Sequence, residues 1–207
     1  MDMVSIAVRI ASNPNVGIYV DLDNTLIFSS PVNSQGESEI DDEDMISLES
    51  TELDIGGSTY RVVLRPNARE FLKSLNSIGS VYLCTSATIG YADAILSAFN
   101  LYPFFKNVIS RELLGKSGVK AHENVVLLDD LRSQSVDVQK KLKIMGVEYE
   151  NPFLNENDYD SYDEYQDAVM DHEKEHYLKH HIMVPSYHGT TNDNALGSIL
   201  SKVKQIV

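Results

Sequence analysis

Cysteine is almost absent from this sequence, since Cys84 is the only one among 207 residues. A single thiol excludes an internal disulfide framework and fits a reducing compartment. Long apolar runs are missing too, and none approaches the roughly 20 residues that a membrane-spanning helix needs. The first ten residues, "MDMVSIAVRI", carry an early Asp2 and make a poor secretory signal. We therefore expect an intracellular protein without membrane association, cytoplasmic or, in a eukaryote, nuclear.

Basic side chains are also scarce. There are 17 Lys and Arg against 31 Asp and Glu, which gives a formal net charge of -14. This balance argues against a basic surface that follows an extended nucleic acid. Most of the excess acid lies in residues 148–181, where the lysines are Lys174 and Lys179. With 43% apolar residues the chain can form one substantial core. We expect a single domain over 1–207 with insertions at about 29–60 and 148–181.

Short apolar runs alternate with helical patterns along the chain. The runs that read as buried strands are residues 17–21, 80–85, 107–110, 125–129 and 182–184. Helical spacing of apolar residues is shared by three sets: Phe71, Leu72, Leu75 and Ile78; Ala92, Ile95, Leu96 and Phe99; Leu196, Ile199, Leu200 and Val203. Strands alternating with helices predict an α/β protein with a doubly wound, Rossmannoid parallel sheet.

The alternation is interrupted after the first strand. Residues 29–50 are polar and acidic, and we expect the acid cluster at 37–44 to be a solvated loop. The segment "ELDIGGSTYRVVLRP" then predicts a β-hairpin, because alternating apolar residues flank Gly56-Gly57. We expect this hairpin, at 53–64, and the acidic segment 148–171 to flank the mouth of the site.

Polar residues end three of the expected strands. Asp21 ends the first, Thr85 the second, and Asp129-Asp130 the fourth. One polar strand end would mean little, because every strand must leave the core. Three such ends on a parallel sheet indicate a site, because ligands bind at the carboxyl ends of the strands.

The segment "DLDNTL" admits three interpretations. A calcium loop of the EF-hand type needs glycine at its sixth position and glutamate at its twelfth, where this chain has Leu26 and Val32. A plain turn stays possible, but it does not explain the other strand ends. The third is phosphoryl transfer, with Asp21 as nucleophile and Asp23 as general acid and base. Clustered carboxylates then require a hard cation, most simply Mg²⁺, and a hydroxyl and a lysine for the phosphate oxygens.

The ordered motifs resemble a known family. "DLDNTLI", "CTSA" and "VVLLDD" are similar to signatures of the haloacid dehalogenase (HAD) superfamily of phosphotransferases. The segments "SSPV", "LDIGGSTYRVVLRPNAREFL" and "LCTSATIGYADAIL", with the tail "VPSYHGTTNDNALGSIL", narrow the resemblance to one branch. This branch holds the phosphatases of the RNA polymerase II carboxy-terminal domain (CTD) and the NLI-interacting-factor-like proteins. The resemblance covers residues 17 to about 110, and 125–130 briefly.

The resemblance implies roles for the strand-end residues. Asp21 would be the nucleophile, Asp23 the acid and base, and Thr85 a catalytic residue that binds the phosphoryl oxygens. Mg²⁺ would be held by Asp21, Asp23 through its carbonyl, and Asp130, with Asp129 beside it. The branch usually has Asp-Asn where this chain has Asp129-Asp130, and Asp-Asp is common in the wider superfamily.

Further residues are implied to bind the phosphate. They are Thr25, Ser86 and a lysine that lies before the fourth strand. Lys120 is the preferred catalytic lysine and Lys116 the other phosphate-binding candidate. The spacing from either lysine to Asp129 is shorter than is usual in the polymerase-tail phosphatases and is similar to that of deoxyribonucleotidases.

The expected function is Mg²⁺-dependent hydrolysis of a phosphomonoester through an aspartyl-phosphate, in the manner of a protein Ser/Thr phosphatase. One alternative is a nucleotidase or a polynucleotide-end phosphatase of the same superfamily. A non-catalytic HAD-fold binding protein is another, although the complete motif set argues against it. The expected partner is a phosphorylated protein or small phosphoester, and the sequence assigns no oligomeric state.

Overall fold

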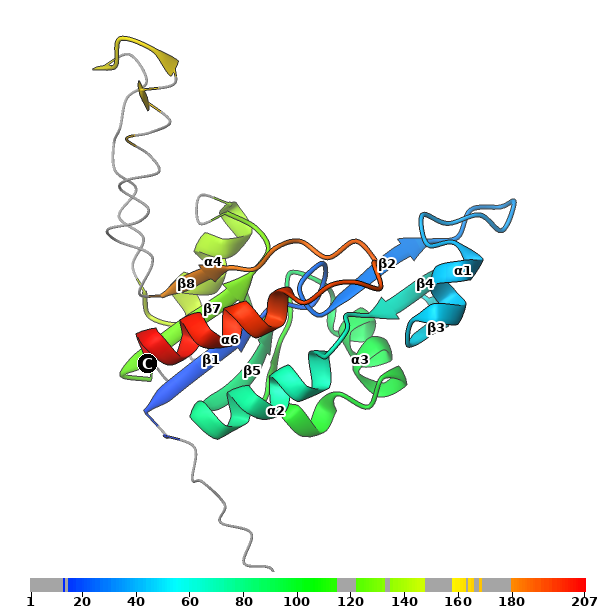
Figure 1. The fold of residues 1–207 in the computed structure, drawn as a ribbon, viewed down its shortest axis with the longest axis horizontal. Helices are drawn as coiled ribbons and strands as arrows, with labels where there is room; N and C mark the ends of the chain where they lie inside the picture. Colours follow the sequence, from blue (N-terminus) through cyan, green and yellow to red (C-terminus); the bar gives the residue numbers. More distant parts are fainter. Residues whose placement is uncertain are drawn as a thin grey trace, which may run out of the picture.

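A five-stranded parallel sheet forms the centre of the protein (Figure 1). The computed structural model describes residues 13, 15–114, 122–132, 135–147, 158–162, 164–165, 168 and 180–207. The strands are β1 (Val16–Val20), β5 (Ser80–Cys84), β6 (Val108–Ile109), β7 (Asn124–Asp129) and β8 (His181–Met183). Their order is β6-β5-β1-β7-β8, and every pair is parallel. The five expected strands and the parallel α/β sheet are thereby confirmed.

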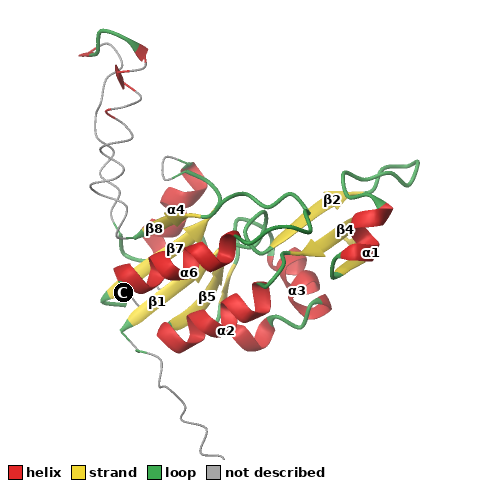
Figure 2. Ribbon diagram, in the orientation of Figure 1, coloured by secondary structure: helices red, strands yellow, loops and turns green. Residues whose placement is uncertain are grey.

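Helices cover both faces of this sheet (Figure 2). They are α2 (Ala68–Ile78), α3 (Ile89–Ala98), α4 (Val136–Ile144) and α6 (Ala195–Ile206), with a short 3₁₀ turn at Tyr102–Phe104. Alternate residues of β7 show the two layers. Val126 and Leu128 belong to the core that α2, α3 and α6 close, whereas Val125 and Leu127 belong to the core beneath α4. The three predicted amphipathic helices are confirmed as α2, α3 and α6.

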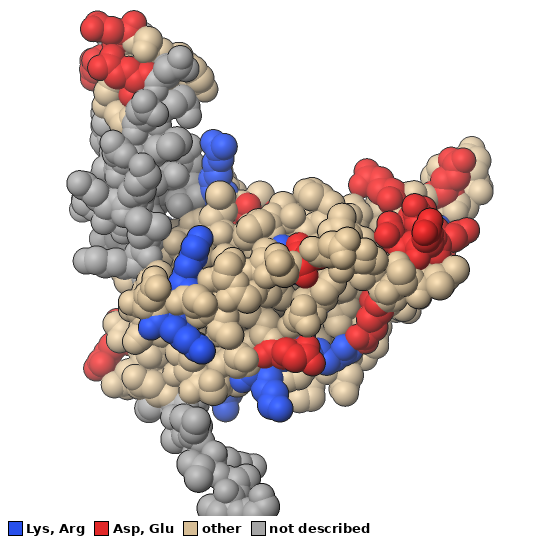
Figure 3. Space-filling view, in the orientation of Figure 1, with Lys and Arg blue, Asp and Glu red and all other residues tan. Residues whose placement is uncertain are grey.

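A second, antiparallel sheet lies beyond the carboxyl end of β1. It consists of β2 (Ile27–Pro31), β3 (Ser50–Ile55) and β4 (Ser58–Leu64), in the order β2-β4-β3. The predicted hairpin is confirmed, and its turn residues Gly56 and Gly57 have φ of 61° and 85°, which glycine adopts without strain. Acidic side chains gather over this part of the molecule (Figure 3).

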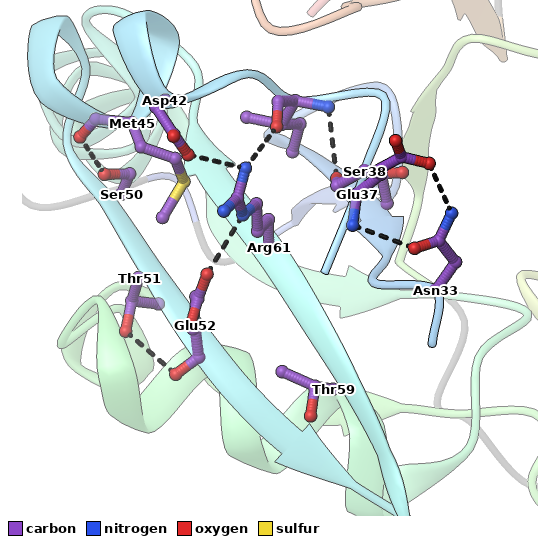
Figure 4. A network of polar contacts seen from close by, with 12 residues as sticks. Asn33, Glu37, Ser38, Asp42, Met45, Ser50, Thr51, Glu52, Thr59 and Arg61 are labelled. Carbon is purple, nitrogen blue, oxygen red and sulfur yellow. Dashed lines mark hydrogen bonds and ion pairs between the residues drawn. The ribbon is translucent and has the colours of Figure 1, made fainter. Parts of the chain in front are cut away.

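The acidic stretch before the hairpin is more ordered than we expected. A helix, α1 (Asp42–Ser47), begins in it because the side chain of Asp41 accepts a hydrogen bond from the backbone amide of Asp44. Arg61 of β4 contacts the Asp42 carboxylate at 2.9 Å, the Glu52 carboxylate at 3.0 Å and the Ile40 carbonyl at 3.1 Å (Figure 4). The prediction of a loop over 37–44 was therefore wrong for its second half, where the ion pair between Arg61 and Asp42 joins a helix to the sheet.

Within the described residues, no helix has the length and apolarity to cross a membrane. Most of the acidic insertion expected at 148–181 lies outside the described residues, as do Lys116 and Lys120.

Candidate active site

The loop that follows β1 is anchored by two leucines that pack into the core. Leu22 and Leu26 are fully buried, and the Leu26 amide donates to the Leu22 carbonyl at 2.9 Å. Asn24 between them has φ of 55°, a left-handed conformation that asparagine tolerates in turns. This tight turn brings Asp21 and Asp23 to the carboxyl edge of the sheet.

The other strand-end residues reach the same place. A cavity of about 430 Å³ is lined by Asp21, Asp23, Thr85, Ser86 and Asp130 together with nine further residues. Asp129 lies beneath it and is fully buried. The three strands β1, β5 and β7 are neighbours in the sheet, so residues far apart in the sequence meet at one edge.

Lys141 is the cation at the centre of this cluster, and the sequence motifs did not point to it. Its Nζ donates to Asp21 Oδ1 at 2.7 Å and to Asp129 Oδ2 at 2.6 Å. The side chain is 1% exposed and comes from α4, which follows the Asp129-Asp130 strand end. The only signal available beforehand was a lysine at an apolar helix position, next to Leu142 and three residues from Val138.

Burial and mutual repulsion shape the acidity of the cluster. Desolvation by burial raises the pKa of Asp21 well above its usual value, and Lys141 opposes this shift. Burial also raises the pKa of Asp130. Desolvation works against the charged form of Lys141, but the Asp21 and Asp129 carboxylates outweigh it and raise the pKa of the lysine. The ammonium is therefore firmly protonated between two buried acids.

Asp23 has a different environment from Asp21. Its Oδ1 accepts a hydrogen bond from the Tyr91 hydroxyl at 2.6 Å, and Lys141 does not contact it. Burial is the main cause that raises its pKa, while the hydrogen bond from Tyr91 lowers it. The two carboxylates, two residues apart, therefore have different partners: Lys141 donates to Asp21, and Tyr91 donates to Asp23.

The hydroxyl residues are placed unequally. Thr85 and Ser86 line the cavity, and Thr85 Oγ1 also accepts from the Ala87 amide at 3.0 Å. Ser86 Oγ is shielded from solvent and has no hydrogen-bond partner within the described part of the chain. Thr25, within the aspartate loop, is fully buried and is not among the described residues that line the cavity.

Arg65 supports the aspartate loop from within the protein. Arg65 is 1% exposed, and its guanidinium donates to the Thr25 carbonyl at 2.9 Å and to the Pro185 carbonyl at 2.8 Å. Its guanidinium also pairs with Asp193 at 2.8 Å and lies over the ring of Tyr187. The Tyr187 amide in turn donates to the Asn24 carbonyl at 2.7 Å. Arg65, which directly follows β4, and the segment between β8 and α6 therefore fix the loop jointly.

The donor set suits a hard divalent cation. Carboxylate oxygens of Asp21, Asp129 and Asp130 lie within 4.8 Å of one another. All of these donors are oxygens, which Mg²⁺ prefers. Lys141 supplies one positive charge to these three carboxylates, so a second cation would compensate the remaining charge. The residues present fit Mg²⁺.

A family model described as NLI interacting factor-like phosphatase matches residues 18–207. No curated protein matches the sequence. Among solved structures, the fold is similar to that of Fcp1, an essential RNA polymerase II CTD phosphatase, with a TM-score of 0.51 and 18% identity. The match covers 91% of this chain and 61% of that one.

A second solved structure is an arginine-to-alanine variant of fission yeast Fcp1 bound to beryllium fluoride. It matches with a TM-score of 0.48 and 19% identity, again over 91% of this chain and 61% of that chain. The chain thus spans about three fifths of the Fcp1 chains that it matches. The likeness to Fcp1 confirms the expected HAD-like fold.

Proposed function

The chain belongs to the NLI interacting factor-like phosphatases of the HAD superfamily, and from this we propose that it hydrolyses phosphomonoesters through a phosphorylated Asp21. The observation that carries the proposal is the meeting of Asp21, Asp23, Thr85 and Asp130 around one cavity, with Lys141 buried against Asp21. We also propose that residues 1–207 act as a single phosphatase domain, which the match over 18–207 supports.

The first step transfers the phosphoryl group to the protein. A carboxylate oxygen of Asp21 attacks phosphorus, and the bond between phosphorus and the ester oxygen breaks. Asp23 gives its proton to the departing oxygen, which leaves as an alcohol. The raised pKa of Asp23 supports this role, because a general acid must carry its proton near neutral pH.

The second step regenerates the enzyme. Water attacks the phosphorus of the aspartyl-phosphate, and its proton passes to the Asp23 carboxylate. The bond between phosphorus and the Asp21 oxygen then breaks and inorganic phosphate is released. Asp23 is protonated again at the end, so the cycle balances.

The transferring group carries negative charge that the cavity must hold. Lys141 lies within hydrogen-bonding distance of Asp21, so its ammonium is placed to stabilise that charge next to the nucleophile. Thr85 and Ser86 line the cavity as hydroxyl donors, and the buried, unpartnered Ser86 Oγ supports such a role.

Mg²⁺ would be held by the carboxylates of Asp21 and Asp130 and the carbonyl of Asp23, with Asp129 beside it. When bound, it would neutralise the carboxylates and polarise the phosphoryl oxygens. The fit rests on the close carboxylates of Asp21, Asp129 and Asp130.

The substrate class that we propose is a phosphoserine or phosphothreonine side chain of a protein. The cavity is about 430 Å³, and its wall includes Tyr60 of the antiparallel sheet and Tyr91 of α3. Such a cavity has room for a phosphorylated side chain. Fcp1, whose fold is similar, is an RNA polymerase II CTD phosphatase and so acts on a phosphoprotein, which supports the same substrate class here.

A hydrolysis assay tests the proposed function. We expect turnover of a generic aryl phosphate and of a phosphoserine peptide. This turnover should depend on Mg²⁺, and a chelator should abolish it. Asp21→Asn should abolish turnover and retain the fold, because an amide cannot form the phosphoenzyme. Asp54→Asn, at the exposed tip of the hairpin, is the control for the same chemical change and should retain activity. Substantial turnover by folded Asp21→Asn protein would contradict the mechanism, and activity confined to nucleotides would replace the proposed substrate class.

A further inference from the structure

Asp23 stands at the end of a chain of hydroxyl groups. The Tyr91 hydroxyl donates to Asp23 Oδ1 at 2.6 Å, and Ser29 Oγ lies 2.5 Å from the same Tyr91 oxygen. Tyr91 comes from the first turn of α3, whereas Ser29 comes from β2. The chain of hydroxyl groups therefore joins the general acid to helix α3 and to the inserted sheet.

The hydrogen bond to Asp23 sets the direction of this chain, because Tyr91 is its donor. Each hydroxyl carries one hydrogen that it can donate. Tyr91 uses its hydrogen on Asp23 Oδ1, so the contact with Ser29 is made by the Ser29 hydrogen donated to the Tyr91 oxygen. The order is Ser29 to Tyr91 to Asp23, and Oδ1 accepts at its end.

An oxygen that accepts this hydrogen bond is not the one that carries the transferable proton. We propose that Tyr91, supported by Ser29, is a positioning residue that reserves Asp23 Oδ1 as an acceptor and so assigns proton transfer to Asp23 Oδ2. This inference deepens the proposed function and rests on it. The proton of Asp23 Oδ2 passes to the ester oxygen as the bond from phosphorus to that oxygen breaks, and Oδ2 later accepts the proton of the attacking water.

The surroundings hold Tyr91 rigidly enough for this task. Its ring meets the ring of Tyr60 edge to face, with centroids 5.9 Å apart and planes at 81°. The hydroxyl is largely buried, and burial raises the pKa of Tyr91 above its usual value, which favours the protonated form that donates a hydrogen bond.

Two substrates with different leaving groups separate this role from a general structural one. The serine oxygen of a phosphoserine peptide is a poor leaving group and needs a proton as it departs from phosphorus. Dinitrophenolate is a good leaving group, departs as an anion and needs no proton. We expect Tyr91→Phe to lower kcat/KM for the phosphoserine peptide about 10- to 100-fold more than for dinitrophenyl phosphate. This loss is part of the roughly 10²- to 10⁴-fold rate enhancement that general acid catalysis contributes. The parameter kcat/KM is the right one, because it reports the step in which the leaving group departs.

Tyr102→Phe is the matched control, because Tyr102 also donates its hydroxyl to a carboxylate, that of Asp93, on the exposed side of α3. It should leave both kcat/KM values unchanged. Ser29→Ala should show the same selective loss as Tyr91→Phe, but a smaller one, and it guards against a folding defect of the tyrosine variant. Equal losses for both substrates in the folded variants, or no loss, would overturn the inference. If the unaltered protein hydrolyses neither substrate, this result would instead overturn the proposed function, and the inference with it.

Discussion

At the scale of single residues, the position of Lys141 governs the charge of the site. Its ammonium lies between the Asp21 and Asp129 carboxylates, and all three side chains are buried. Removing a cation from such a cluster leaves like charges facing one another in a medium that solvates them poorly. The lysine therefore serves the folded protein as well as the proposed reaction.

Lys141→Met should lower kcat about 100- to 1,000-fold, the usual cost of losing one group that stabilises charge in a transition state. The free energy of unfolding should fall by about 3–5 kcal/mol, because two buried carboxylates lose their partner. Steady-state kinetics and denaturant titration measure the two effects. Lys140→Met is the control, because Lys140 is its exposed neighbour on α4 and should change little.

The comparison with Lys120→Met decides between the lysines. If Lys120→Met abolishes turnover while Lys141→Met retains it, the phosphate-binding lysine is the one that the family resemblance implied.

The aspartates could be predicted from the sequence but Lys141 could not. Asp21, Asp129 and Asp130 end apolar strands, and a parallel sheet places all its strand ends at one edge, so local pattern and topology agree. Lys141 lies in "QKKLK", which reads as a solvated stretch. Its burial depends on how α4 packs against β7, a tertiary property that the neighbouring apolar residues Val138 and Leu142 indicate only weakly.

At the scale of elements, Arg65 joins parts of the chain that the sequence separates. It follows β4 directly and binds the aspartate loop at Thr25 and the terminal segment at Pro185 and Asp193. A buried guanidinium with this many partners orders three segments at once. The arginine therefore sets the position of the loop that carries Asp21.

Arg65→Met should reduce the free energy of unfolding by about 3–5 kcal/mol, because Asp193 and two carbonyls lose a buried donor. Arg69→Met offers the contrast, since Arg69 pairs with the half-exposed Glu49 and its ion pair should contribute less than about 1 kcal/mol. Denaturant titration of both variants gives the comparison. Equal destabilisation would show that the Arg65 contacts are not the main support.

The sequence predicted the helices and strands that bury a regularly spaced set of apolar residues. It did not predict the elements that polar contacts stabilise. The central strands and the helices α2, α3 and α6 show apolar residues at the period of their structure. By contrast, α1 has no buried residue and is held by the Asp41 cap and by Arg61. Strand β2 reads "IFSSP" and is a strand because β4 offers its edge.

At the scale of the whole molecule, one of the groups of exposed acidic side chains lies over the inserted sheet (Figure 3). Exposed acidic residues of this region are Glu37, Glu39, Asp41, Asp42 and Glu43. The same sheet contributes Tyr60 to the wall of the cavity. A phosphorylated polymer approaching the cavity would therefore meet like charge, and the repulsion acts over a Debye length of about 8 Å at physiological salt.

A long phosphorylated oligonucleotide should consequently be a poorer substrate than a phosphoserine peptide with few other charges. Its kcat/KM should rise as salt increases from about 0.02 to about 0.2 M, because screening weakens the repulsion, whereas the peptide should respond little. The double variant Glu39→Gln with Glu43→Gln should reduce this salt dependence. Glu70→Gln with Glu123→Gln changes the net charge equally on α2 and at the amino end of β7, away from the cavity, and should leave it intact. Preferred hydrolysis of the oligonucleotide end at low salt would reverse the ranking, and the acidic surface would then lie outside the path of the substrate.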